Sequence, residues 1–425
     1  MPRARPQLGL EEAPPDAADP SAAGGPIPVR MAQVDEALAL VSRQPAIERI
    51  ERVELDHAGG RVLADDVVAR RSAPAWDVSA MDGYAVRDAD LAADWNGLMV
   101  VGEAFAGQAR VPVLAPRTAM RIFTGAPAPL GADRVVAQED VRRVGDRVLA
   151  PGPSAGKRHI RRAGSDFRAG DVLVAAGLAL SPTRLLAVAA ADVGEVSVRA
   201  RPRVIVVATG DELRAPGQDV AAAGSIPESG SFGVAELARR FGADVTRRRR
   251  LPDDLQRLSA AAAEMVESAD VVVVVGGASV GERDYSRAMF EPLGLRMLFS
   301  KVAMRPGKPV WFGQAGAARV IGLPGNPTAA MVTARLFLAP LITALSGQDA
   351  QTALAWRRRP LIEGLEAGGA REQFIGARLD GEAVQAFANR DSSAQKVLAA
   401  AEALIRRRAG QAAAAPGDLV ETLDF

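Results

Sequence analysis

The chain has 425 residues, which suggests about three domains, and its 52 basic and 51 acidic residues give no electrostatic case for binding nucleic acid or an anionic membrane. It has no cysteine and only two histidines, which excludes disulfides, thiolate nucleophiles and multi-histidine metal centres. Any chemistry must therefore use carboxylates, hydroxyls, lysine, arginine and backbone amides. A bound metal would be a hard, oxygen-ligated ion such as Mg²⁺.

Residues 1–28 are rich in proline and alanine and lack the apolar segment of a secretory signal, so we expect a disordered leader on a cytoplasmic protein. No stretch reaches the roughly 18 apolar residues that a membrane span needs. Apolar residues at helical spacing in "VRMAQVDEALALVSRQ" predict an amphipathic helix, and Ser181–Pro182 predicts the start of another. We expect residues 29–55 and 160–200 to form one discontinuous linker domain.

Residues 56–159 carry short β-branched runs separated by Gly, Pro and Asp, which predicts an inserted β-rich domain. Residues 201–347 repeat a strand, a loop and a helix, and the strands are continuous apolar runs such as "VVVVV" at 271–275. Because such strands are buried on both faces, we expect a central three-layer α/β domain with a parallel-type sheet. Residues 348–425 show short alternating strands and predict a small, barrel-like C-terminal β domain. The fold class is thus multidomain α/β.

Two loops follow apolar strands of this sheet, at the position where open α/β sheets bind ligands. Thr209–Glu212 carries two adjacent carboxylates, one of which has the alternative role of an N-cap for the next helix. Gly276–Asp284 begins with Gly276 and Gly277, whose missing Cβ atoms let backbone N–H groups approach a ligand closely. Both loops are therefore candidates for a binding site.

A third loop, Gly322–Thr328, has the composition of a strand–helix connection. Asn326 is placed as an N-cap and Pro327 as the first helical residue, so the helix N-terminus would point at the crevice and could hold an anion. A rigid turn with no ligand explains this loop equally well when it is taken alone.

Lysine occurs only four times in the chain, and two of the four, Lys301 and Lys308, lie in one eight-residue stretch with Arg305 between them. Three cations beside a Pro-Gly turn suit a compact oxyanion such as phosphate. We expect the other runs of basic residues to be solvated or ion-paired: 247–250, 357–359 and 406–408.

Three segments outside the predicted sheet are dense in small and turn-forming residues: "SAMDGYAV", "RIFTGAPAP" and "RRAGSDFRAG". They carry the isolated polar groups Asp82, Thr124 and Asp166, and turn chemistry explains each of them singly. We interpret His57 and His159 as structural or exposed. The tryptophans are scattered and form no stacking pattern for nucleic acid.

Six motifs, read in chain order, carry a resemblance to a known family: "SAMDGYAV", "RIFTGAPAP", "ATGDEL", "GGASVGERDY", "KVAMRPGKP" and "GLPGNPTAA". From about residue 30 to the C-terminus, the chain resembles the molybdopterin molybdenumtransferase family, which includes MoeA and the gephyrin E domain. The central domain of that family is shared with smaller molybdopterin-binding proteins, so the order of all six motifs makes the resemblance specific.

The resemblance implies an enzyme of molybdenum cofactor biosynthesis that forms elongated homodimers of four-domain subunits. Such an enzyme hydrolyses the pyrophosphate bond of adenylated molybdopterin with Mg²⁺, inserts molybdenum from molybdate into the dithiolene and releases AMP. We therefore expect Mg²⁺ as cofactor, these two small-molecule substrates, and a molybdopterin adenylyltransferase as upstream partner. The dithiolene sulfurs provide the soft ligands that molybdenum requires, so the absence of cysteine is no obstacle.

The functional residues of the family carry over onto the matching motifs of this sequence. Those expected in catalysis are Asp82, Thr124, Asp166, Glu212, Asp253 and Asp284. Of these, Glu212 and Asp284 follow buried strands at crevice positions where a carboxylate has no packing role, so we expect them to help bind Mg²⁺ and the pyrophosphate. The expected contacts to substrate and oxyanion are Gly276, Gly277, Ser279, Lys301, Arg305, Lys308, Pro324, Gly325, Pro327 and Arg371.

The sequence departs from the family pattern in places. Arg305 stands where the family usually has lysine, which keeps the charge but changes the donor geometry. Pro227–Gly230 replaces an Asp-Ser/Thr-Asn turn, and Ser392 and Ser393 lie somewhat early for the serine that the family offers to molybdate. The last two departures favour one alternative, a molybdopterin-binding scaffold without efficient insertion. A further alternative is a Mg²⁺-dependent nucleotide pyrophosphatase built on the central domain.

Overall fold

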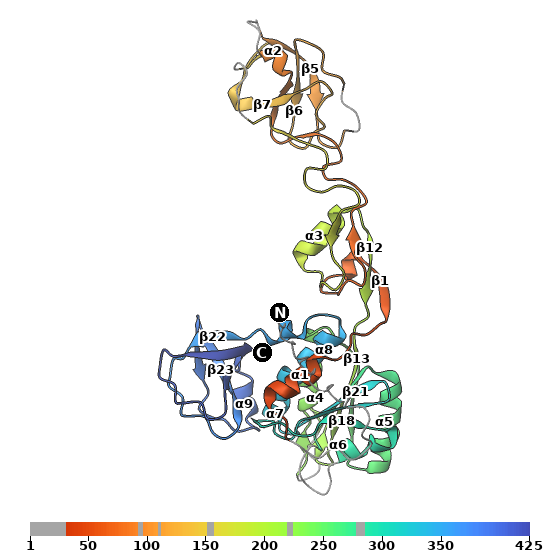
Figure 1. Cartoon of the computed structure of the whole chain (residues 1–425), viewed down its shortest axis with the longest axis vertical. Coiled ribbons are helices and arrows are strands. Elements are labelled where there is room, and N and C mark those ends of the chain that lie inside the picture. Colours follow the sequence, from red (N-terminus) through yellow and green to blue (C-terminus); the bar gives the residue numbers. More distant parts are fainter. Residues whose placement is uncertain (1–30, 92–96, 109–111, 151–156, 219–223, 278–284) are drawn as a thin grey trace, which may run out of the picture.

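The computed structural model describes residues 31–91, 97–108, 112–150, 157–218, 224–277 and 285–425. Figure 1 shows an elongated chain with a β-rich part at one end and a narrow middle part below it. An α/β part and a second β part lie side by side at the other end. Each part has its own apolar cluster.

The β-rich end is built on a sheet with the strand order β7-β4-β6-β5-β9-β8, called the outer sheet. Neighbouring residues Tyr84 and Ala85 of β4 pack into different apolar clusters, so both faces of the outer sheet are covered. This agrees with the β-rich texture of the sequence. The elements of this end are β3 (Val78–Ser79), β4 (Gly83–Val86), α2 (Asp88–Leu91), β5 (Leu98–Ala104), β6 (Thr118–Ile122), β7 (Arg134–Ala137), η3 (Gln138–Asp140), β8 (Arg142–Val144), β9 (Arg147–Leu149) and β10 (Ile160–Arg161).

The middle part joins two antiparallel strand pairs, β1 with β12 and β2 with β11, to helix α3. Helix α3 begins as predicted, because the Ser181 hydroxyl accepts a hydrogen bond from the Arg184 backbone N–H at 3.3 Å. Residues 58–69, which the sequence places in the inserted domain 56–159, instead contribute to the apolar cluster of the middle part. The elements are β1 (Ile50–Glu54), η2 (Leu55–His57), β2 (Val67–Val68), β11 (Val172–Val174), α3 (Pro182–Ala190) and β12 (Glu195–Arg199).

The α/β part is built on the central sheet, with the strand order β16-β13-β17-β21-β20-β18. Its strands are β13 (Arg203–Thr209), β16 (Asp244–Leu251), β17 (Val271–Val275), β18 (Arg296–Phe299), β20 (Trp311–Ala315) and β21 (Ala318–Leu323). β13, β16, β17 and β21 pair in parallel, as the continuous apolar runs predict. β20 is antiparallel to both of its neighbours, which is a departure from a purely parallel sheet. As a consequence, β18 again runs in the same direction as β21.

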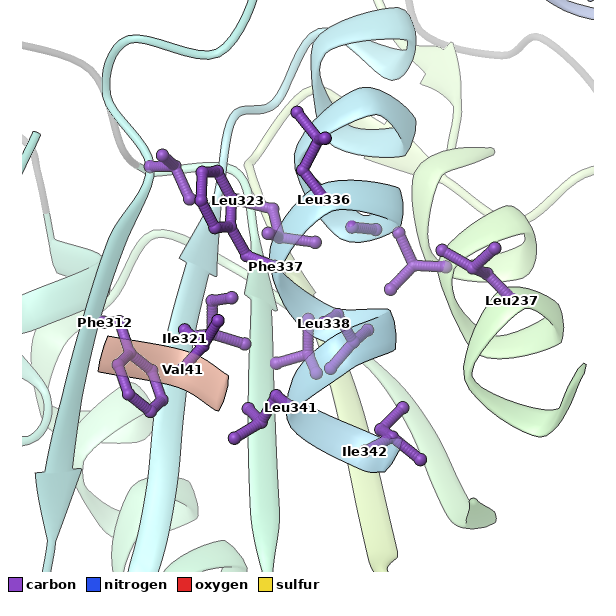
Figure 2. Packing of buried hydrophobic residues seen from close by; sticks show 14 of the residues in the cluster. Val41, Leu237, Phe312, Ile321, Leu323, Leu336, Phe337, Leu338, Leu341 and Ile342 are labelled. Atoms are coloured by element: carbon purple, nitrogen blue, oxygen red, sulfur yellow. The ribbon is translucent and has the colours of Figure 1, made fainter. Parts of the chain in front are cut away.

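Alternate residues of the central strands are buried on opposite faces of the sheet. On β13, Val206 packs into the cluster that contains helices α4 (Gly230–Arg240) and α8 (Ala339–Leu345), and Val207 packs into the cluster of helix α5 (Leu255–Ser268). The sheet therefore lies between two helical layers, as expected. Figure 2 shows Phe312, Ile321 and Leu323 of the strands facing the helical layer of the first cluster. Further elements of this part are β14 (Leu213–Arg214), β15 (Ile226–Pro227), α6 (Tyr285–Ala288), η4 (Glu291–Leu293) and η6 (Ala350–Leu354).

A long apolar helical run from Pro327 to Leu345 lies in the same layer as α4. It consists of α7 (Pro327–Thr333), the π-helical segment η5 (Ala334–Leu338) and α8. Pro340 has no N–H, and in a regular α-helix its ring would clash with the Leu336 carbonyl, which explains the widened turn before it. Within the described residues, this is the one helix long and apolar enough to cross a membrane, and 89% of its apolar 18-residue window is buried inside the protein.

Helix α1 (Val34–Ser42) forms as the apolar spacing predicts, but it packs on the α/β part. Val34, Leu38 and Val41 share a cluster with α8 residues, whereas the sequence places residues 29–55 in the linker domain. The Arg406 guanidinium binds the carboxylates of Asp35 in α1 and Glu372. Helix α1 is therefore held between the central sheet and the C-terminal β part.

The C-terminal β part is a sheet with the order β19-β23-β25-β26-β22, with β24 paired to β23. β19 lies in the loop between β18 and β20, so this sheet is joined directly to the α/β part. Closure into a barrel stays a prediction. The basic runs at 247–250, 357–359 and 406–408 are confirmed as containing ion-paired arginines. The elements are β19 (Met304–Arg305), β22 (Arg357–Pro360), β23 (Glu372–Asp380), β24 (Ala383–Ala386), α9 (Gln395–Leu398), β25 (Ala403–Arg407) and β26 (Leu419–Asp424).

A partly buried carboxylate fixes the middle part to the central sheet. Asp270, directly before β17, accepts hydrogen bonds from the Arg49 guanidinium at 2.7 and 2.8 Å and from the Arg203 backbone N–H at 2.8 Å. Burial alone would raise the pKa of Asp270, but the hydrogen bonds from Arg49 and Arg203 outweigh it and lower the pKa from 3.8 to about 2. The ionised form is therefore the one that the fold stabilises.

We expect Asp270→Asn to lower the unfolding free energy at pH 7 by about 1–2 kcal/mol, allowing for solvent screening. Because the pKa is lower in the folded state, the contribution of Asp270 is present above about pH 4 and is lost as the pH falls through about 2. Urea unfolding of the variant and the wild type at pH 7 and at about pH 2 measures this difference in unfolding free energy. Asp244→Asn removes an exposed carboxylate from β16 and serves as control. Equal stability of Asp270→Asn and wild type at pH 7 would contradict the assignment.

Candidate functional site

The loops singled out in the sequence meet at one edge of the central sheet. β13, β17, β21 and β18 run in the same direction, so the segments that follow them leave at their common carboxyl ends, called the carboxyl edge. The segment after β18 begins at Ser300 and contains the lysine-rich stretch 301–308. The topology thus brings the cations to the same edge as the acidic and glycine-rich loops, which the sequence alone does not indicate.

The first loop holds a carboxylate close to the backbone. A Cβ atom on Gly210 would lie 2.7 Å from an oxygen of Glu212, so the Glu212 side chain folds over this glycine. The Asp211 carboxylate accepts a hydrogen bond from the Asp253 backbone N–H at 3.1 Å. Glu212 therefore belongs to this loop, and Asp253 contacts the loop through its backbone N–H. Both residues are expected in catalysis. The N-cap alternative is wrong for this loop, because the next helix, α4, begins only at Gly230.

The second loop passes very close to the end of β13. Gly276 has φ +100°, and a Cβ atom there would lie 2.6 Å from the Thr209 carbonyl oxygen. Gly277 has φ +63° and would place a Cβ atom 3.2 Å from Thr209 Oγ1. Thr209 Oγ1 is buried and has no hydrogen-bond partner among the described residues. The expected site residues Ser279 and Asp284 lie outside the described residues.

The third loop meets the C-terminal β part. Helix α7 begins at Pro327 as predicted, but Asn326 does not cap it through its side chain. Instead, Asn326 Nδ2 donates to Ser392 Oγ at 2.9 Å, and the Thr328 backbone N–H donates to the Ser392 carbonyl at 3.0 Å. Ser392, which lies early in the sequence motif, is thus held at the N-terminus of α7.

The two prolines and the glycine of this loop shape the same edge. Pro324 is buried, and Pro327 is partly buried at the start of α7. A Cβ atom on Gly325 would lie 3.5 Å from the Gly276 Cα, so the second and third loops are in close proximity. All three residues expected from this motif therefore lie beside the second loop.

The cationic segment, residues 301–308, has no acidic ion-pair partner in the described part of the chain. Lys301 is partly buried, Arg305 and Lys308 are exposed, and in the described part of the chain none of them has a carboxylate within 4.0 Å. Arg371 Nη1 donates to the Met304 carbonyl at 3.4 Å, which adds a fourth cation to this segment. These positive charges are available to bind an anion.

A cavity of about 180 Å³ lies between the cationic segment, helix α7 and the C-terminal β part. Arg305, Thr328, Asn389 and Arg390 contribute polar groups to its lining, which also includes the acidic residues Glu366 and Asp391. Thr328 Oγ1 is buried and has no hydrogen-bond partner within the described ranges. An oxyanion bound here could accept a hydrogen bond from this hydroxyl and meet positive charge from two segments.

Glu228 caps a helix at the carboxyl edge, a role that the sequence analysis did not predict. Its buried carboxylate accepts hydrogen bonds from the Ser231 backbone N–H at 2.6 Å and the Ser231 hydroxyl at 2.7 Å. It therefore caps the N-terminus of α4 at the carboxyl edge, within the segment that departs from the family turn. The sequence signal for this cap was the three-residue spacing from Glu228 to Ser231 at the start of the amphipathic helix α4.

Three expected catalytic residues lie far from the carboxyl edge of their own chain. Asp82 Oδ1 accepts hydrogen bonds from the Thr124 backbone N–H and hydroxyl, both at 2.8 Å, and these bonds lower the pKa of Asp82. Both residues belong to the outer end of the molecule, opposite the central sheet (Figure 1). Asp166 is exposed beside the Ala73–Phe167 bridge, where the middle part connects to the outer end.

The carboxylates of the first loop match the ligand preference of Mg²⁺. In the described residues no group of three acidic or histidine side chains is arranged to hold a metal alone. Mg²⁺ is commonly bound by one or two carboxylates together with substrate phosphates and water, so Glu212 and its neighbours at this edge fit such a shared site.

Comparisons with known proteins cover most of the chain. Residues 32–194 match the family described as "MoeA N-terminal region (domain I and II)", and residues 205–344 match "Probable molybdopterin binding domain". A molybdopterin molybdenumtransferase of Haemophilus influenzae is 36% identical over 335 residues, covering 78% of this chain and 80% of that protein. One of Synechococcus elongatus is 37% identical over 322 residues, covering 74% and 79%.

The fold of this chain is also similar to that of a solved structure. The structure of a molybdopterin biosynthesis moeA protein from Pyrococcus horikoshii OT3 superposes with a TM-score of 0.80. It is 25% identical in sequence, and the match covers 93% of this chain and all of that chain. The arrangement of parts in this chain is therefore similar to that of an experimentally determined relative.

We expect Gly276→Ala to lower the unfolding free energy by about 1–3 kcal/mol or more, because alanine is strained at this φ and its Cβ would clash with the Thr209 carbonyl. Gly294→Ala is the matched control, since Gly294 also has a positive φ but nothing within 4 Å of the added Cβ. Urea unfolding followed by tryptophan fluorescence compares them. A loss for Gly276→Ala no larger than that for Gly294→Ala would contradict the close approach.

Proposed function

This chain belongs to the molybdopterin molybdenumtransferase family and is an enzyme of molybdenum cofactor biosynthesis; from this premise we propose its reaction. It inserts molybdenum from molybdate into the dithiolene of adenylated molybdopterin, hydrolyses the adenylate and releases AMP. The observation that carries the proposal is the carboxyl edge, where acidic, glycine-rich and cationic loops leave neighbouring strands.

In this proposal the cationic segment holds the oxyanions. Lys301, Arg305 and Lys308 provide charge that described acidic residues do not neutralise, and Arg371 adds a planar guanidinium. Lysine suits a compact tetrahedral anion as a point charge, whereas arginine donates two parallel hydrogen bonds. Ser392 and Thr328 supply hydroxyl groups beside them. Molybdate and the pyrophosphate of the adenylate are both anions of this kind.

The glycine-rich loops and the acidic residues act on the adenylated substrate. Gly276 and Gly277 leave backbone room for the pyrophosphate, and the N-terminus of α7 faces the same edge. Glu212, with Asp284, would hold Mg²⁺, which supplies charge neutralisation for the leaving phosphate when it is bound. Asp253 stays a proposed catalytic residue. Its backbone N–H donates to the Asp211 carboxylate, which places it beside the loop that carries Glu212.

Asp82, Thr124 and Asp166 act, in this proposal, on the carboxyl edge of a second copy of the chain. Their separation from the carboxyl edge of their own subunit supports a homodimer in which each outer end completes the partner's cleft. We further propose that the dimer works in the cytoplasm and receives its adenylated substrate from a molybdopterin adenylyltransferase.

Product analysis tests the proposed reaction. The chain is incubated with adenylated molybdopterin, Mg²⁺ and molybdate, and AMP and active cofactor are both measured. The proposal requires both products. AMP without molybdenum insertion would favour a nucleotide pyrophosphatase, and neither product would favour a molybdopterin-binding scaffold.

We expect mixed dimers to recover activity from two inactive variants, Asp82→Ala and Glu212→Ala. One cleft of a heterodimer then carries both substitutions and the other carries neither, so up to about half of the wild-type activity should return. The measurement is AMP release by heterodimers purified through two different tags. Homodimers of each variant are the control. Heterodimers that stay inactive would show that each site is built within one chain.

Substitutions of Lys301 test the oxyanion site. We expect Lys301→Ala to weaken molybdate-dependent cofactor formation by roughly 10- to 150-fold, the equivalent of one charge-assisted hydrogen bond. Lys301→Arg should also be impaired, because the planar guanidinium is larger and directional. Arg358→Ala removes an exposed arginine from β22 and is the control. A wild-type molybdate response of Lys301→Arg would contradict the geometric argument. Unchanged cofactor formation by Lys301→Ala would contradict the assignment of Lys301 to the oxyanion site.

A further inference from the structure

A second cavity lies at the opposite end of the central strands. It has a volume of about 240 Å³, many times the roughly 10–15 Å³ that one water needs. The middle part contributes residues near β2 and β12, and the α/β part contributes the turn after α4 and the end of α8. We call it the arginine cavity, after four of its lining residues: Arg61, Arg199, Arg201 and Arg240.

The arginine cavity has a strong excess of positive charge. Its described lining contains these arginines and no aspartate or glutamate. Glu51 neutralises Arg61 from outside the lining, at 2.6 Å. Arg199, Arg201 and Arg240 have no carboxylate within 4.0 Å in the ranges that the structure describes. In a chain with nearly equal numbers of acidic and basic residues, such a concentration of unneutralised charge calls for a partner.

The helix ends beside the cavity do not provide this partner. α4 and α8 both end here, and helix carbonyls attract cations. However, backbone groups already satisfy these carbonyls: the Ala243 N–H donates to Ala238, and the Gln348 N–H donates to Thr343. These six-to-one bonds, with Gly242 and Gly347 in the left-handed region, are Schellman endings. The arginines are therefore not needed as caps.

A buried arginine behind the cavity adds to the positive potential. Arg335 lies in the π-helical segment and donates to the Ala353 carbonyl, at 2.8 Å, where Ala353 lines the cavity. Burial, and after it the charge of Arg240, lowers the pKa of Arg335 to about 10. The charge on Arg240 is thus unfavourable to its neighbour, and a bound anion would relieve this repulsion.

We propose that the arginine cavity binds a small anion of the phosphate or pyrophosphate class, carrying at least two negative charges. Guanidinium groups bind such oxyanions through paired, charge-assisted hydrogen bonds. Arg199 comes from the middle part and Arg240 from the α/β part, so the bound anion also ties these two parts together. The site lies at the amino ends of the central strands and is independent of the reaction proposed for the carboxyl edge.

Calorimetric titration of the full chain with inorganic pyrophosphate, at constant ionic strength, tests the proposal. A background with Lys301→Gln and Lys308→Gln removes the lysines of the carboxyl edge. We expect saturable binding of one pyrophosphate per chain in this background. Adding Arg201→Gln and Arg240→Gln should weaken it at least tenfold, the equivalent of one lost charge-assisted contact. Adding Arg358→Gln, which removes an exposed, unpaired arginine from β22, should change nothing.

A second variant retains all the arginines. Gln348→Glu places a negative charge in the lining that competes with the anion for the arginines, so it should also weaken pyrophosphate binding at least tenfold. Absence of saturable binding in the lysine background would overturn the proposal. Equal affinities for the two arginine-cavity variants and the Arg358 control would overturn it as well. Neither result depends on AMP release, so a failure here is distinguishable from a failure of the proposed reaction.

Discussion

Burial of the central strands on both faces is the constraint on which the rest of this structure depends. When Val206 and Val207 both need an apolar layer, no polar group can leave the sheet through either face. Binding groups are then confined to the two edges where strands begin and end. The carboxyl edge collects the acidic, glycine-rich and cationic segments, and the amino edge holds the arginine cavity.

The sequence predicted the local features well, because they depend on neighbouring residues. The valines of β17, the Ser181–Pro182 helix start and the Asn326–Pro327 helix boundary all follow from short-range patterns. The sequence did not predict features that depend on pairing between distant segments. The reversed direction of β20, and with it the placement of Lys301 at the carboxyl edge, requires the order of strands in the sheet.

The same limit applies to the site residues. Ser392 is early in its motif, yet a hydrogen bond from Asn326 brings it to the start of α7. The amphipathic spacing of α1 predicts a helix but not the elements against which it packs. Asp35 of α1 forms an ion pair with Arg406, which lies 371 residues further along the chain. Asp82 and Thr124 form their own hydrogen-bonded pair, and their separation from the carboxyl edge is the observation on which we base the proposal of a second subunit.

We propose that the oxyanion binds at the carboxyl edge, together with the loop around Ser392. The most direct test is anomalous diffraction at the molybdenum absorption edge, from crystals of the full chain grown with molybdate. We expect an anomalous peak contacted by the cationic segment, Arg371 and the N-terminus of α7. A peak found only at the amino edge of the sheet, or no peak at the carboxyl edge under saturating molybdate, would contradict it.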